Sequence, residues 1–135
     1  MIVNYYNGFK NSMIMNNANF QFLADEIKVL LITDQYNFDA THFTLNSLVS
    51  GDELVGEGYA AGGKSLSNKS RTNQSLFADN LSWTQITGDV SGALIYKASG
   101  GALIAHVDFQ FTFTPSAEEF QLNWGVSGIF VLSTD

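Results

Sequence analysis

The 135-residue chain contains no cysteine and a single proline, Pro115. Without cysteine it can form neither disulfides nor thiolate metal sites. It also carries little charge: 14% of its residues are charged, and lysine and arginine together number six. A surface that follows phosphate groups needs many cations, whereas this chain has a net charge of −7. We therefore expect no binding to nucleic acid and no binding to anionic membranes.

Long hydrophobic runs are missing as well, since no run approaches the ~20 residues of a membrane span. Residues 1–9 have neither the charged region nor the apolar region of a signal peptide, so we expect synthesis in a cytoplasm. Hydrophobic residues nevertheless make up 45% of the chain and include 11 phenylalanines, which excludes a disordered protein. The length predicts one domain with its own core. The low charge is compatible with extensive protein contacts and equally with an ordinary β-protein.

The stretch Ala102–Thr114 predicts one long strand, which Pro115 ends because proline cannot donate to a β-ladder. Apolar residues recur at every second position, and polar residues stand between most of them. This period of two places one face on a core and the other in water or against a partner. The expected inward residues are Leu103, Ala105, Val107, Phe109, Phe111 and Phe113, and the polar ones are His106, Asp108, Gln110 and Thr112.

Shorter strand patterns recur along the rest of the chain, separated by turn residues, without the regular helices that would connect parallel strands. They are Ile27–Thr33, Leu81–Thr84, Ala93–Lys97, Phe120–Trp124 and Ile129–Leu132. The sequence therefore predicts an all-β fold, an antiparallel β-sandwich that is jelly-roll-like. Residues 1–19 are expected to form a short helix or an arm, and residues 20–135 the sandwich domain. The predicted core contains Leu103, Val107, Phe109, Leu122, Trp124 and Ile129.

The segment Gly58–Ser65 matches the phosphate-binding pattern G-x-x-x-x-G-K-[ST] letter for letter. That pattern binds phosphate only between a buried strand and a helix whose N-terminal amides face the anion. Residues 50–55 before it are no buried strand, and residues 66–73 after it have no helical apolar stripe. We therefore interpret the glycines as a tight loop and expect no nucleotide cofactor.

Other candidate chemistry is weak. His106 and Asp108 neighbour each other on one strand face, but the only other histidine, His42, lies in a distant loop, so we expect no metal. The adjacent carboxylate pairs point to opposite strand faces and form no acid–base dyad by themselves. Trp83 and Trp124 could stack on a sugar, although their alternation with apolar residues favours core packing. We expect no catalytic residue and no enzyme activity, with a small hydrolase as the weakest hypothesis.

Several segments, in order, resemble a family of small bacteriophage virion structural proteins over residues 20–133. The central one is the glycine-rich pattern G-x-G-Y-x-x-G-G-x-x-L, supplied by Gly56, Gly58, Tyr59, Gly62, Gly63 and Leu66. The others are Ile27–Thr33, Thr41–Phe43, Asp79–Trp83, Leu94–Lys97, Leu103–Phe109, and Phe120, Leu122, Trp124, Gly128, Ile129 and Leu132. The polar arm at 66–76 is short, and relatives often carry glycine and serine in place of Phe111–Phe113.

The resemblance implies a capsid decoration (cement) protein on the outer surface of a virion. Its partners would be the major capsid protein and further copies of itself, most simply in a trimer. The alternative is a carbohydrate- or receptor-binding module of a tail or fibre. An N-terminal segment, the glycine-rich loop and the polar arm are the candidate contact elements, although the N-terminal aromatic residues could instead cap their own domain. The candidate contact residues are Tyr5, Tyr6, Phe9, Met13, Tyr59, Lys64, Lys69 and Arg71.

Overall fold

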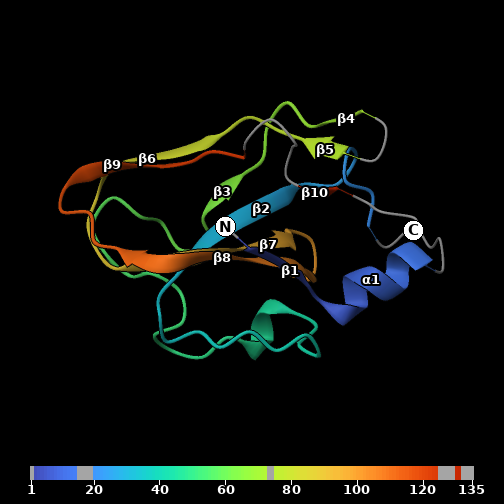
Figure 1. The fold of residues 1–135 in the computed structure, drawn as a ribbon, viewed down its shortest axis with the longest axis horizontal. Coiled ribbons are helices and arrows are strands. Elements are labelled where there is room, and N and C mark those ends of the chain that lie inside the picture. The colour runs from blue at the N-terminus through green and yellow to red at the C-terminus, as the bar shows by residue number, and fades with distance from the viewer. Residues whose placement is uncertain (1, 15–19, 73–74, 125–129, 132–135) are drawn as a thin grey trace.

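The computed structural model describes residues 2–14, 20–72, 75–124 and 130–131. It shows the predicted all-β fold, in which every described strand pair is antiparallel. A five-stranded sheet forms the middle layer, two smaller sheets lie above it, and the segment 33–50 lies below it (Figure 1). This layering is sandwich-like, and the jelly roll stays a prediction.

The five-stranded sheet has the order β1-β8-β7-β2-β3. Its strands are β1 (Ile2–Tyr5), β2 (Ile27–Ile32), β3 (Lys64–Ser65), β7 (Val90–Lys97) and β8 (Leu103–Phe113). The upper layer contains a three-stranded sheet, β10-β5-β4, and a two-stranded sheet, β6-β9. Its strands are β4 (Ser70–Thr72), β5 (Ser75–Phe77), β6 (Leu81–Ile86), β9 (Glu118–Leu122) and β10 (Phe130–Val131).

The predicted strands in the middle of the chain are confirmed. β2 pairs with β7 along its whole length, from Ile27 opposite Lys97 to Ile32 opposite Gly92. Both strands are buried on both faces, which explains why their apolar runs are continuous rather than alternating. The polar arm forms the hairpin β4–β5, with exposed residues in β4 and the buried Leu76 in β5.

The N-terminal segment belongs to the central sheet, a pairing that the sequence analysis does not predict. β1 lies on the outer edge of β8, with Val3 opposite Val107. Tyr6 follows, and the helix α1 (Asn7–Ile14) then packs on β8. No helix in the described ranges has the length and apolar character needed to cross a membrane.

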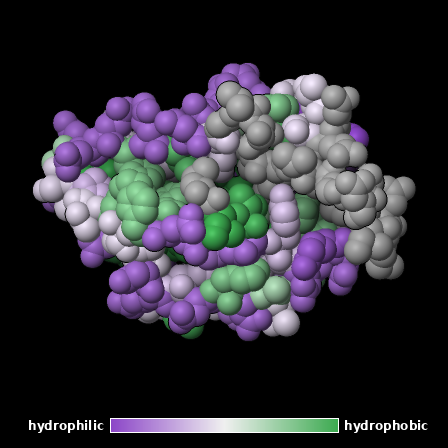
Figure 2. Space-filling view, viewed as in Figure 1, coloured by the Kyte–Doolittle hydropathy of each residue, from purple (hydrophilic) through white to green (hydrophobic). Residues whose placement is uncertain are grey.

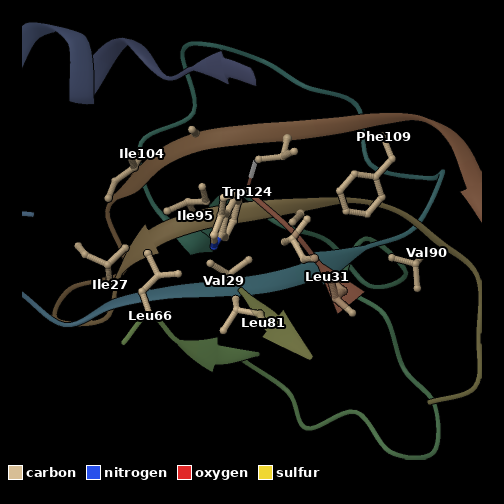
Figure 3. Packing of buried hydrophobic residues seen from close by; sticks show 14 of the residues in the cluster. Ile27, Val29, Leu31, Leu66, Leu81, Val90, Ile95, Ile104, Phe109 and Trp124 are labelled. Atoms are coloured by element: carbon tan, nitrogen blue, oxygen red, sulfur yellow. The ribbon is translucent and has the colours of Figure 1, made fainter. Parts of the chain in front are cut away.

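The main core lies between the central sheet and the upper layer. Figure 3 shows Val29, Leu31 and Ile95 gathered around Trp124, and all four belong to one buried cluster. Val107, Phe109 and Leu122 belong to it too, which confirms the prediction for these residues and for Trp124. Fully burying each large apolar side chain contributes roughly 1.5–3 kcal/mol.

Leu103 was predicted in this core but lies in a second cluster on the opposite face of the sheet, with Tyr6 and Tyr36. The reason is a bulge: Ile95 faces Ala105 while Tyr96 faces Leu103, so β8 has one extra residue there. One extra residue turns the following side chains to the other face. The predicted core residue Ile129 lies outside the described residues.

Candidate functional site

The clearest surface feature is an apolar groove between the end of β8 and β9, here called the aromatic groove. Its volume is about 410 Å³. Figure 2 shows hydrophobic side chains gathered between the two layers in the left half of the view, where Figure 1 places the end of β8 and the start of β9. Its lining residues are Phe109, Phe111, Phe113, Glu119, Phe120, Gln121, Leu122 and Asn123.

Two of these phenylalanines are open to solvent. Phe111 is 63% exposed and Phe113 is 38% exposed, although the alternation in the sequence predicts both on the core face. Phe113 faces the core residue Val90 and packs on Phe109 and Phe120, so it lies on the core face at its open edge. The prediction is wrong for Phe111, because β8 bulges again there: Gly92 faces Asp108, whereas Val90 faces Phe113. A move of two residues along β7, from Gly92 to Val90, is therefore matched by a move of five residues along β8, from Asp108 to Phe113. Gln110, at the bulge, has a φ of +70°, and its backbone N–H donates to Asp108 Oδ1 over 2.7 Å.

The exposed rings continue into the core as a chain of aromatic contacts. Phe111 lies 4.4 Å from Phe113 between ring centroids, and Phe113 lies 5.6 Å from Phe120 in an edge-on arrangement. Phe120 in turn lies 6.3 Å from Trp83. Because Phe120 and Trp83 are buried, the groove has a rigid floor, which lowers the entropic cost of binding a partner.

Acidic side chains flank the groove. Glu119 Oε2 accepts a hydrogen bond from Ser82 Oγ over 2.8 Å, and Glu118 Oε1 accepts one from the Ser116 N–H over 3.0 Å. Both residues are exposed, and no cationic side chain lines the groove. The sequence signal for this site is the set of three phenylalanines at alternate positions, Phe109, Phe111 and Phe113, close to the proline that ends the long strand.

The predicted N-terminal contacts are mostly core residues. Tyr6 and Phe9 are buried in their own chain, which agrees with the alternative that they cap their own domain, and their contact with a partner stays a prediction. Tyr6 shares a short hydrogen bond with Tyr36, and burial raises the pKa of its hydroxyl. Tyr5 is half-buried and stacks on Phe9 at 5.8 Å. The side chain of Met13 lies outside the described residues.

The glycine-rich loop is fastened to the central sheet by Tyr59. Its hydroxyl donates to Glu53 Oε2 over 2.5 Å and accepts from the Leu31 N–H over 3.1 Å. Burial raises the pKa of this hydroxyl, so it stays a donor throughout the physiological range. The last two residues of the G-x-x-x-x-G-K-[ST] motif form β3, and the next described element is the strand β4 rather than a helix. Lys64 there donates to the Ser82 carbonyl oxygen, and its Nζ lies 5.6 Å from the Trp83 ring.

Lys69 and Arg71 lie at the other end of the molecule from the aromatic groove. Lys69 donates to the Asp25 carbonyl oxygen and lies 5.7 Å above the Phe22 ring, and desolvation lowers the pKa of its amine. Arg71 is exposed on β4 and, with Phe22, lines a second apolar pocket of about 310 Å³. The predicted contact residues therefore do not form one site.

The residues considered as metal ligands or as sugar-binding residues lie apart from one another or are buried. Across the described ranges, no group of three or more His, Cys, Asp or Glu side chains is placed to hold a metal ion. Trp83 and Trp124 are 2% and 8% exposed, so neither offers a platform for a sugar. His106, expected on the polar face of its strand, is buried, because the segment 33–50 covers that face.

His106 makes stability depend on pH. It stacks on Phe38 at 5.4 Å, and desolvation lowers the pKa of its imidazole below the ordinary value. The unfolded chain therefore binds the proton more readily, so this contribution to the free energy of unfolding is complete above pH ~6.5 and is lost as the pH falls below it. We expect the urea midpoint to fall less steeply between pH 7 and pH 5 in His106→Gln than in the wild type. Parallel curves would contradict this.

These features define the chain as a small all-β protein with a sandwich-like core and an exposed aromatic groove at one end. Searches against protein-family models, curated proteins and solved structures find no match.

Proposed function

We propose that this protein is a non-enzymatic bacteriophage virion protein that decorates the outer capsid surface. There it binds the major capsid protein and stabilises the contacts between neighbouring copies. The observation that carries the proposal is the aromatic groove, a contiguous apolar surface exposed on a rigid frame. Exposed apolar patches of this kind mark interaction sites, whereas single exposed apolar residues do not.

The residues that carry the family resemblance have structural roles that are consistent with it. Tyr59 and the glycines around it hold the loop against the central sheet, and Tyr96 Oη donates to the Gly62 carbonyl oxygen over 2.5 Å. Leu66 is buried just beyond the loop. A small sandwich braced in this way keeps its binding surface in a fixed position, which suits a protein that bridges large subunits.

Cementing would act through simultaneous contacts. A shell under internal pressure fails where capsomers separate, and a bound bridge must be released before they part. We propose a homo-oligomer, most simply a trimer, because an oligomer matches the local symmetry of a shell and binds with a raised effective concentration. Light scattering on the purified protein is expected to show this oligomer, and a monomer at high concentration would contradict self-association away from the shell.

Particles made without this chain are expected to assemble but to release DNA at a lower temperature than complete particles. Binding to the intact shell alone stabilises it by RT ln(1 + [L]/Kd) per site, about 2.7 kcal/mol at a hundredfold excess over Kd. The measurement is DNA release on heating, with and without added purified protein. Immunogold labelling of complete particles then locates the chain on the capsid.

The same particles test the alternative, a tail or fibre module. Depleted particles that are as heat-stable as complete ones, yet fail to attach to cells, would overturn the decoration proposal. Labelling confined to the tail would do the same.

A further inference from the structure

Eight carboxylates gather at one end of this protein, whereas Asp25 and Glu26 lie at the other end of β2, where Asp25 Oδ2 is 3.7 Å from Lys97 Nζ. The acidic end is where β2 and β8 finish and where β7 and β9 begin. Its carboxylates are Asp34, Asp52, Glu53, Glu57, Asp89, Asp108, Glu118 and Glu119. The six lysines and arginines lie elsewhere: Lys28 and Lys97 at the opposite end of the β2–β7 pair, Lys64 on β3, Lys10 on α1, and Lys69 and Arg71 at or near β4.

The aromatic groove opens at this acidic end. Asp52 and Glu53 are used internally, because they accept hydrogen bonds from Val49 and from Tyr59. Glu57, Glu118 and Glu119 are exposed. Exposed phenylalanine rings beside exposed carboxylates select a partner that is apolar and cationic together, since a partner of like charge would be repelled by these carboxylates.

The groove also borders an open strand edge. Within the described part of the chain, β9 pairs only with β6, so its second edge carries backbone N–H and C=O groups without a strand partner. Along β9 the side chains alternate: Glu119 and Gln121 are exposed, and Phe120 and Leu122 are buried. A strand added to this edge would place alternate side chains beside Phe120 and over the exposed rings, and the others beside Glu119.

We propose that the aromatic groove binds an extended segment of a partner protein in which apolar residues alternate with lysine or arginine. The segment adds a strand to β9, its apolar side chains cover Phe111 and Phe113, and its cations pair with the acidic rim. A cation above a phenylalanine face adds further attraction. Identifying this partner as the capsid protein rests on the proposed function, whereas the chemistry of the groove does not.

The test uses two labelled heptapeptides, one alternating lysine with valine and the other alternating glutamate with valine. Fluorescence anisotropy with the full chain is expected to show binding of the lysine peptide only, weakening as salt is raised. Because aromatic residues at the centre of an interface are often its energetic hot spots, Phe111→Ala is expected to weaken binding about tenfold or more. Glu119→Lys is expected to weaken binding of the lysine peptide more than Phe111→Ala does.

The matched control is Phe43→Ala, because Phe43 is 62% exposed but lies outside the groove. It should leave peptide binding unchanged, and far-ultraviolet circular dichroism should show all variants folded. Equal binding of both peptides, or full binding by folded Phe111→Ala, would overturn the proposal. Loss of self-association in Phe111→Ala would also overturn it, because the occupant would then be a second copy of the chain.

Binding of the same variants to depleted particles separates the two proposals. If wild-type protein and Phe111→Ala stabilise particles equally, the groove does not bind the capsid protein, and the decoration function stands through another surface. If the lysine peptide binds as expected but the chain is absent from particles, the decoration function fails and the groove inference stands.

Discussion

Gly63→Ala is expected to destabilise the protein by about 3 kcal/mol, from positive-φ strain and overpacking together. Gly63 has a φ of +75°, and an added Cβ would lie 1.9 Å from the Val29 carbonyl oxygen and 2.7 Å from Leu30 Cα. Both obstacles are backbone atoms of β2, an inner strand of the five-stranded sheet, and not the end of a flexible side chain that could move aside. For a chain of this length we expect the melting temperature to fall by about 10 °C.

Gly100→Ala is the matched control. Gly100 has a similar φ of +82°, but an added Cβ there would meet nothing within 4 Å. This variant therefore carries the conformational strain without the collision, which is expected to cost about 1 kcal/mol. Thermal unfolding of the two variants measures the difference. Equal losses would show that the close approach of the loop to β2 contributes nothing.

Trp83→Ala is expected to cost about 3–5 kcal/mol, the usual range for removing a buried large aromatic side chain. Trp83 is 2% exposed and contacts Tyr59, Phe120 and the Lys64 amine. The loss is a large part of the 5–15 kcal/mol that stabilises a typical domain. Urea unfolding followed by circular dichroism measures it.

Two controls accompany this variant. Trp83→Phe keeps an aromatic ring in the core beside Phe120 and is expected to lose less stability than Trp83→Ala. Phe43→Ala removes an exposed ring and is expected to change stability by no more than about 0.5 kcal/mol. A urea midpoint for Trp83→Ala equal to that of the wild type would contradict the role of Trp83 as the link between the two layers.

The site was harder to predict than the strands because exposure depends on strand register. Phe109, Phe111 and Phe113 look equivalent in the sequence, each one position after a polar residue. Only the extra residues in β8, visible when its pairing with β7 is known, separate the buried Phe109 from the exposed Phe111. The same dependence on pairing explains why Leu103 was assigned to the wrong side of the sheet.

The local sequence pattern also could not predict that the N-terminal aromatic residues are buried. The local sequence pattern fits either one face of a helix or an exposed arm, because the aromatic residues Tyr5, Tyr6 and Phe9 would have similar spacing in both. Their place was decided by β1, which pairs with residues 105–108, about a hundred positions later in the chain. Contacts at such separation leave no periodic signal near the residues that make them.

The sequence by itself determined the fold class, because alternation, β-branched runs and turn residues are local and each strand carries its own. It also predicted that Gly58–Ser65 is a loop rather than a phosphate-binding turn, since the strand and helix that such a turn needs would have been visible beside the motif. Only the tertiary structure decided which aromatic side chains reach the surface and which carboxylates gather at one end. Both depend on register and on the direction in which each strand runs, and these are properties of strand pairs rather than of any one segment.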